Sequence, residues 1–146
     1  MIHYKCTKMT FPLLIVFLVL IHTANSFTFN PKYTLHIISN LPTNSSISKV
    51  HCRSGDNDLE IRTLKSDDQF DFSSHTQGNT LFSCSFSWGL KINSFDVFSK
   101  GNKYCSIVYF KNEHCYYLMG DDGFYFAKGN SMSQLSDFKF IAPWYD

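Results

Sequence analysis

The segment of residues 80–88 constrains the fold more than any other part of the chain, because apolar and polar residues alternate strictly from Phe82 to Trp88. Phe82, Cys84, Phe86 and Trp88 occupy every second position, and serines lie between them. Successive side chains of a strand point to opposite faces of the sheet. This period of two therefore predicts a strand with one buried face and one face in water.

Other short segments rich in β-branched and aromatic residues recur along the chain, with polar turns between them. Phe70 and Phe72 alternate with acids in the same manner. Strands at this spacing predict an all-β fold, a two-sheet antiparallel β-sandwich of short strands held by disulfides. The other predicted strands cover residues 33–39, 47–54, 59–64, 94–98, 104–110, 115–119, 124–126 and 137–144.

The N-terminus has the three parts of a secretory signal peptide. The first ten residues are basic without an acid, the next eleven carry no charge, and Ala24 and Ser26 are the small residues that signal peptidase reads. The alternative is an uncleaved membrane anchor, but the apolar part is shorter than the roughly 20 residues that span a bilayer. We expect residues 1–26 to be removed, leaving residues 27–146 as a single domain.

The charge of this domain excludes some classes of partner. Without Lys5 and Lys8, the chain keeps 11 basic side chains against 12 acidic ones, a net charge of about −1 with histidine neutral. Nucleic acids and anionic membranes attract basic faces. We therefore expect no nucleic-acid partner and no membrane insertion, and we expect a monomer.

The cysteines indicate an oxidising compartment. Cys6 lies in the signal peptide, and an even number remains in the domain: Cys52, Cys84, Cys105 and Cys115. Four cysteines in an exported chain predict two disulfides. No Cys-x-x-Cys pair is present, which argues against a zinc site, and pairing argues against a catalytic cysteine.

Two of these cysteines each follow a histidine, His51 and His114, as if both pairs lay on neighbouring central strands. The histidines could then form a pH-sensitive pair or a weak metal site, although two outward-facing side chains are the simpler interpretation. Four cysteines allow three connectivities. Among them we favour Cys52–Cys115 and Cys84–Cys105.

The acidic residues do not have the spacing of a calcium loop. They are interpreted as turn residues in water. A hydrolase would need a nucleophile, a base and an orienting group in one pocket, and the chain has no nucleophile-elbow glycine pattern. We expect no catalytic residue, no metal site and no cofactor. The acids considered are Asp56, Asp58, Asp67, Asp68, Asp121 and Asp122.

A glycosylation sequon begins at Asn44, followed by Ser45 and Ser46. It lies in a predicted loop of an exported chain, so we expect Asn44 to be accessible for N-glycosylation.

Several segments, in their order and spacing, resemble the plant self-incompatibility protein family, also called the S-protein homologues. The chain departs from the usual pattern at Glu60, where the family usually has Gly, and at Tyr117, where it usually has Trp. The matching segments are VHCRS at 50–54, DNDL at 56–59, TLFSCSFSWG at 80–89, FDVF at 95–98, the Cys105 and Cys115 pair, and DDGFY at 121–125.

The resemblance implies a β-sandwich secreted by a plant cell. Founding members of the family look like stigma-secreted signals that a pollen membrane receptor recognises. The resemblance therefore implies a secreted extracellular signalling ligand, not an enzyme, acting in cell–cell recognition or pollen–pistil signalling through a membrane receptor of another cell. A secreted defence or inhibitor protein on the same scaffold is the alternative, and a secreted hydrolase is a third.

Specificity in such a protein should reside in exposed loops carried by the rigid sandwich. The candidate loops are residues 40–46, 55–58, 73–79 and 100–103. Within them, the receptor-contact candidates are Asp56, Asp58, Lys100 and Lys103.

Overall fold

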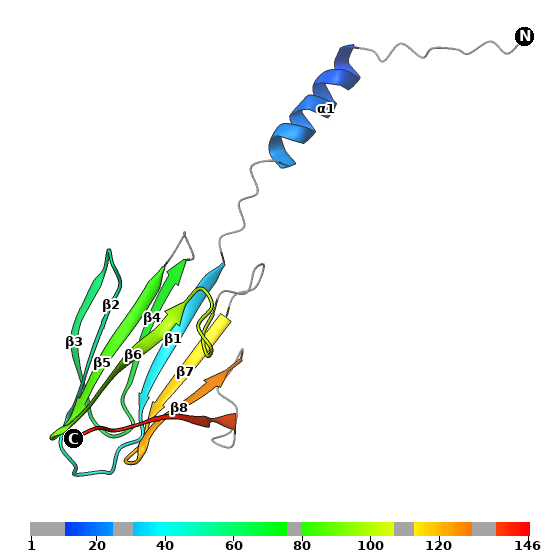
Figure 1. Ribbon diagram of the computed structural model, residues 1–146. Coiled ribbons are helices and arrows are strands. Elements are labelled where there is room, and N and C mark those ends of the chain that lie inside the picture. The colour runs from blue at the N-terminus through cyan, green and yellow to red at the C-terminus, as the bar shows by residue number, and fades with distance from the viewer. Residues whose placement is uncertain (1–10, 25–30, 76–79, 107–112, 130–136) are drawn as a thin grey trace, which may run out of the picture.

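The computed structural model describes residues 11–24, 31–75, 80–106, 113–129 and 137–146 (Figure 1). These residues form one helix and nine strands. The elements are α1 (Phe11–Ala24), β1 (Lys32–Ser39), β2 (Ser48–Arg53), β3 (Asp58–Leu64), β4 (Gln69–His75), β5 (Leu81–Trp88), β6 (Lys91–Ser99), β7 (Glu113–Met119), β8 (Gly123–Lys128) and β9 (Lys139–Pro143).

The strands form two sheets, which confirms the predicted β-sandwich. One sheet has five strands in the order β4-β1-β7-β8-β9, and the other has four in the order β3-β2-β5-β6. Every pair is antiparallel except β1 and β7, which run parallel. Of the predicted strand 104–110, residues 104–106 form no strand and the remainder lies outside the described residues.

Aromatic rings from both sheets fill the space between them. Tyr33 of β1 packs on Phe98 of β6 with ring centroids 4.4 Å apart, and Phe86 of β5 packs on Phe124 of β8 at 4.8 Å. The alternation along β5 points Phe82, Cys84 and Phe86 into this core, as predicted, while Trp88 is only partly buried. Such aromatic pairs add to the free energy gained by burying their area.

Tyr117 joins the two sheets by a hydrogen bond as well as by packing. Its hydroxyl donates to the carbonyl oxygen of Val97 on β6 at 2.6 Å. The side chain is fully buried, and burial raises the pKa of Tyr117, so the hydroxyl keeps its proton. Tyr117 is therefore a specific link between the two sheets.

The disulfides are Cys52–Cys84 and Cys105–Cys115, so the favoured pairing was wrong. Cys52 and Cys84 lie directly opposite each other on β2 and β5, with Cα atoms 4.1 Å apart. Cys115 belongs to the other sheet, where β7 lies between β1 and β8. The premise of neighbouring central strands failed because β2 and β7 never pair.

Helix α1 lies outside the hydrophobic core. Its leucines, valines and isoleucine at positions 13–16 and 18–20 are exposed, and the buried hydrophobic residues begin at Tyr33. Among the described residues, no helix combines the length and the apolar character that crossing a membrane requires. Cleavage after Ser26 stays a prediction.

Candidate recognition surface

The structure brings two of the predicted loops to one end of the four-stranded sheet. The turn between β2 and β3 follows Arg53, and the loop after β6 follows Ser99. Arg53 pairs with Ser83 and Ser99 pairs with Leu81, both near the start of β5. Both loops therefore project from the same end of the sandwich (Figure 1).

Backbone and side-chain hydrogen bonds fix the β2–β3 turn. The Ser54 amide donates to the Asn57 carbonyl at 2.8 Å, and the Asn57 amide donates to the Ser54 hydroxyl at 3.1 Å. Asp56 is exposed at the tip. This candidate residue is thus presented on a turn whose shape depends on its neighbours.

Asp58 is the first residue of β3 rather than a residue at the tip of the turn. Its Oδ1 accepts hydrogen bonds from His51 Nε2 at 2.7 Å and from the Glu60 amide at 2.9 Å. The bond from His51, then the bond from Glu60, lowers the pKa of Asp58. Asp58 therefore has a local structural role besides any contact with a partner.

The loop after β6 is organised by Asn102. Its Oδ1 accepts from the Tyr104 amide at 2.7 Å, and its Nδ2 donates to the Asp96 carbonyl at 2.9 Å. Lys100 and Lys103 are exposed on this loop. Two flexible cations are thus held on a backbone that other residues shape.

A disulfide adjoins each of these two loops. Cys52 comes two residues before Ser54, and Cys105 comes two residues after Lys103. Cys105–Cys115 also connects the loop after β6 to β7 of the opposite sheet. The end that carries the candidate residues is therefore covalently braced.

A polar cleft of about 340 Å³ opens at the same end. Ser54, Asp56 and Asn57 line it from the β2–β3 turn, and Ser74 and His75 line it from β4. Residues 73–75 of the predicted loop 73–79 thus belong to strand β4, and residues 76–79 lie outside the described residues. The cleft places Asp56 where both sheets contribute polar groups.

The predicted loop 40–46 lies at the opposite end of the sandwich, beside the start of β2 and the end of β5. Asn44 is exposed there, and the neighbouring Ser45 hydroxyl accepts a hydrogen bond from Trp88 Nε1 at 3.2 Å. Glycosylation of Asn44 stays a prediction. A glycan on Asn44 would leave the end with Asp56 and Lys100 uncovered.

The remaining acidic residues occupy turns, as predicted. The Asp68 carboxylate accepts from the Lys65 amide at 2.8 Å, and Asp121 and Asp122 lie in the β7–β8 turn closed between Gly120 and Gly123. The described residues contain no group of three or more His, Cys, Asp or Glu side chains placed to hold a metal ion.

The two histidines that precede cysteines do not approach each other. His51 bonds to Asp58 in the four-stranded sheet, and His114 bonds to His36 in the five-stranded sheet. The pair of His51 and His114 that was considered as a possibility does not form, because β2 and β7 belong to different sheets. No motif indicated His36, since it lies 78 residues from His114.

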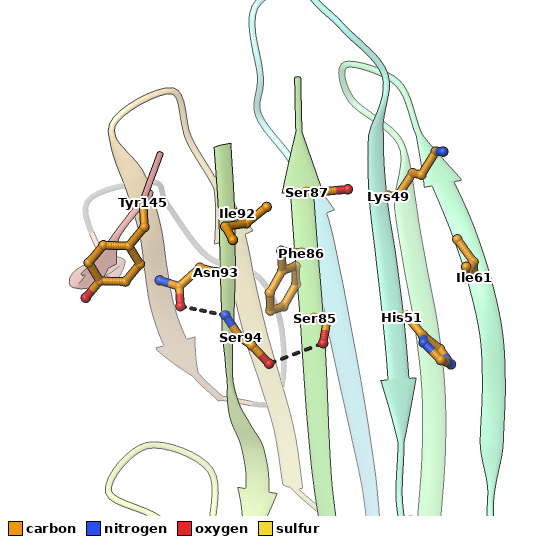
Figure 2. Close-up of a pocket in the computed structure, with 10 residues that line it drawn as sticks. All are labelled: Lys49, His51, Ile61, Ser85, Phe86, Ser87, Ile92, Asn93, Ser94 and Tyr145. Atoms are coloured by element: carbon orange, nitrogen blue, oxygen red, sulfur yellow. Dashed lines mark hydrogen bonds between the residues drawn. The ribbon is translucent and has the colours of Figure 1, made fainter. Parts of the chain in front are cut away.

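A groove of about 610 Å³ on the outer face of the four-stranded sheet was not identified from the sequence (Figure 2). The Ser85 and Ser94 hydroxyls lie 3.2 Å apart in it, and the exposed side chains of Ile61 on β3 and Ile92 on β6 also line it. The alternating serines of β5 predicted a face in water but not its hollow shape. The groove combines hydroxyl groups with exposed apolar side chains.

A small two-sheet β-sandwich with two disulfides and braced loops at one end defines a compact extracellular type of domain. The family model of plant self-incompatibility protein S1 matches residues 34–144. The chain belongs to this family.

S-protein homolog 2 of Arabidopsis thaliana is 38% identical over 78 residues, which cover 52% of this chain and 48% of that protein. The chain thus spans about half the length of this curated relative. A solved structure of self-incompatibility protein homologues covers 80% of this chain and 97% of its own, with a TM-score of 0.59 and 16% identity, and it shows the shared fold.

That solved structure is described as representing a widespread family of small, highly stable, secreted proteins from plants. The expected extracellular location agrees with this description of the family.

Proposed function

We propose that this chain is an extracellular recognition ligand that binds a membrane receptor of another plant cell through the end carrying Asp56, Asp58, Lys100 and Lys103. The observation that carries the proposal is the gathering of these charges at one end of the sandwich, on two loops and the start of β3, with a disulfide next to each loop. Loops that are already held in one conformation lose less conformational entropy on binding than flexible loops do.

The mixture of charges favours a protein partner. Carboxylates and ammonium groups at one end can complement an opposite arrangement on a receptor, which increases specificity and the rate of association. A nucleic acid or an anionic membrane would instead favour a uniformly basic face. The function is binding rather than catalysis.

Binding of the oxidised, labelled mature protein to intact plant cells tests this proposal. Asp56→Lys and Lys100→Glu should each weaken binding about tenfold or more, as expected for contacts near the centre of an interface. Matched charge reversals at the opposite end, Asp121→Lys and Lys65→Glu, should bind like the wild type. Both control residues are exposed.

Cross-linking the bound protein to the cell surface should then capture a membrane protein. Thermal melting of all four variants shows whether the fold is intact. Equal binding by the four variants and the wild type, or equal losses at both ends, would overturn the assignment of this surface. Absence of saturable binding would contradict the proposal that a membrane receptor binds this protein.

A further inference from the structure

His36 and His114 form a direct imidazole pair on the outer face of the five-stranded sheet. In the parallel pairing of β1 with β7, Thr34 lies opposite His114 and His36 lies opposite Tyr116, so the histidines are diagonal neighbours. His36 Nε2 lies 2.9 Å from His114 Nδ1. The rings are stacked, with centroids 5.3 Å apart and planes 11° apart.

The neighbours of His36 hold its ring in position. Asp71 Oδ1 lies 2.8 Å from His36 Nδ1, and the same oxygen accepts from Gln69 Nε2 at 2.7 Å. The Tyr116 ring stacks on the His36 ring, with centroids 4.4 Å apart. The His36 side chain is 13% exposed, so it is largely held among these groups and still reaches solvent.

The contact between His36 and Asp71 is one that metal-binding histidines commonly make with a neighbouring carboxylate. In metal sites, one ring nitrogen commonly binds the ion while the other donates to a carboxylate, which fixes the tautomer and raises the basicity of the ligand. Asp71 is the carboxylate that accepts from Nδ1 of His36. The other ring nitrogen, Nε2, therefore carries the lone pair and faces His114. The Asp71 carboxylate also places negative charge close to the pair.

We propose that His36 Nε2 and His114 Nδ1 together bind a divalent copper ion, with water completing the coordination. Two bonds of about 2.0 Å at right angles separate the nitrogens by roughly 2.8 Å, whereas a tetrahedral angle separates them by roughly 3.3 Å. The observed 2.9 Å is a separation at which two nitrogens can bind one ion. Cu²⁺ also binds nitrogen ligands more tightly than the other divalent first-row metals do.

Binding requires a change of tautomer at His114. Because Asp71 accepts the Nδ1 proton of His36, His36 Nε2 is an acceptor, and His114 Nδ1 donates to it in the metal-free protein. When copper binds both nitrogens, the proton on His114 leaves Nδ1 and His114 carries one at Nε2, exchanged through solvent. Both rings remain neutral, and rotation of the two side chains turns their lone pairs toward the ion.

The site is separate from the proposed receptor surface, so either proposal can fail without the other. The proposed site has two protein ligands. The described residues contain no group of three or more His, Cys, Asp or Glu side chains placed to hold a metal ion, so water supplies the remaining ligands. Its ligands come from β1 and β7, which only the topology brings together.

Titration of the untagged, oxidised mature protein with copper(II) sulfate tests the site. Calorimetry should show one ion per chain, and electron paramagnetic resonance should show hyperfine coupling to two imidazole nitrogens. His36→Gln and His114→Gln should each lower the affinity at least tenfold, and Asp71→Asn should lower it about tenfold or more. His51→Gln is the matched control and should bind like the wild type.

Melting of each metal-free variant shows whether it is folded. Unchanged copper affinity in folded His36→Gln and His114→Gln, or an equal loss in His51→Gln, would overturn the site. The wild-type spectrum decides independently of the variants, because coordination by fewer than two imidazoles contradicts the proposal.

Discussion

Glu60 adopts a left-handed backbone conformation, with φ of +58°, where β3 changes register against β2. Leu59 and Glu60 there lie opposite the single residue Cys52, because Ile61 pairs with His51 and Asp58 pairs with Arg53. Bulges of this kind favour glycine at the left-handed position. The chain has glutamate where the resemblance to its family leads us to expect glycine, so we predict that Glu60→Gly stabilises the protein.

The magnitude follows from two opposing effects. The left-handed conformation costs a residue with a Cβ roughly 1–2 kcal/mol, and glycine avoids this cost. Glycine also increases the freedom of the unfolded chain, which removes about 0.4–1 kcal/mol of the gain. The free energy of unfolding should therefore rise by about 0.5–1 kcal/mol. The hydrogen bond from the residue 60 amide to Asp58 is made by the backbone and remains.

Urea denaturation and thermal melting of the oxidised mature protein measure this change, and the melting temperature should rise by roughly 2–5 °C. Glu60→Ala is the matched control, because it removes the exposed charge but keeps the Cβ. Its stability should stay within about 0.5 kcal/mol of the wild type. If the glycine variant is no more stable than the alanine variant, the backbone argument is refuted.

Three further predictions concern the core and the turn. Phe86→Ala should lower the free energy of unfolding by about 3–5 kcal/mol in urea denaturation, and Trp88→Ala by less because Trp88 is only partly buried; equal losses would contradict the assigned burial. Tyr117→Phe should cost about 1–3 kcal/mol by leaving a buried carbonyl without its donor, and an unchanged denaturation midpoint would contradict this. In an NMR titration, Asp58 should have a midpoint below 3.8 that rises in His51→Gln. Because the pKa of Asp58 is lower in the folded protein, the hydrogen bonds to its carboxylate stabilise the fold above the ordinary pKa, and this stabilisation is lost as pH falls through the folded pKa. A midpoint at or above 3.8 would contradict the predicted shift.

Local alternation was sufficient to predict which residues enter the core. Tyr33, Leu35 and Ile37 alternate along β1 and are all fully buried, as are Cys115, Tyr117 and Met119 at alternate positions of β7. These residues lie in the core because a strand's period of two is a property of the backbone. The partial exposure of Trp88 depends instead on its place at the end of β5.

Strand pairing depends on contacts between distant segments, which local pattern does not specify. Cys84 is the cysteine opposite Cys52 only because β5 pairs with β2 in one register. His36 and His114 meet only because β1 and β7 run parallel. The disulfide connectivity and the histidine pair were therefore beyond a prediction from residue spacing.

The loop geometry separates the four receptor-contact candidates into two kinds. Asp56, Lys100 and Lys103 are exposed on backbones that neighbouring residues shape, with a disulfide close to each loop. Asp58 accepts the amide of Glu60 and so helps to hold the bulge. Substitutions at the first three positions can alter recognition while leaving stability nearly unchanged. A substitution at Asp58 affects both properties, so a loss of binding there does not by itself identify a contact with a receptor.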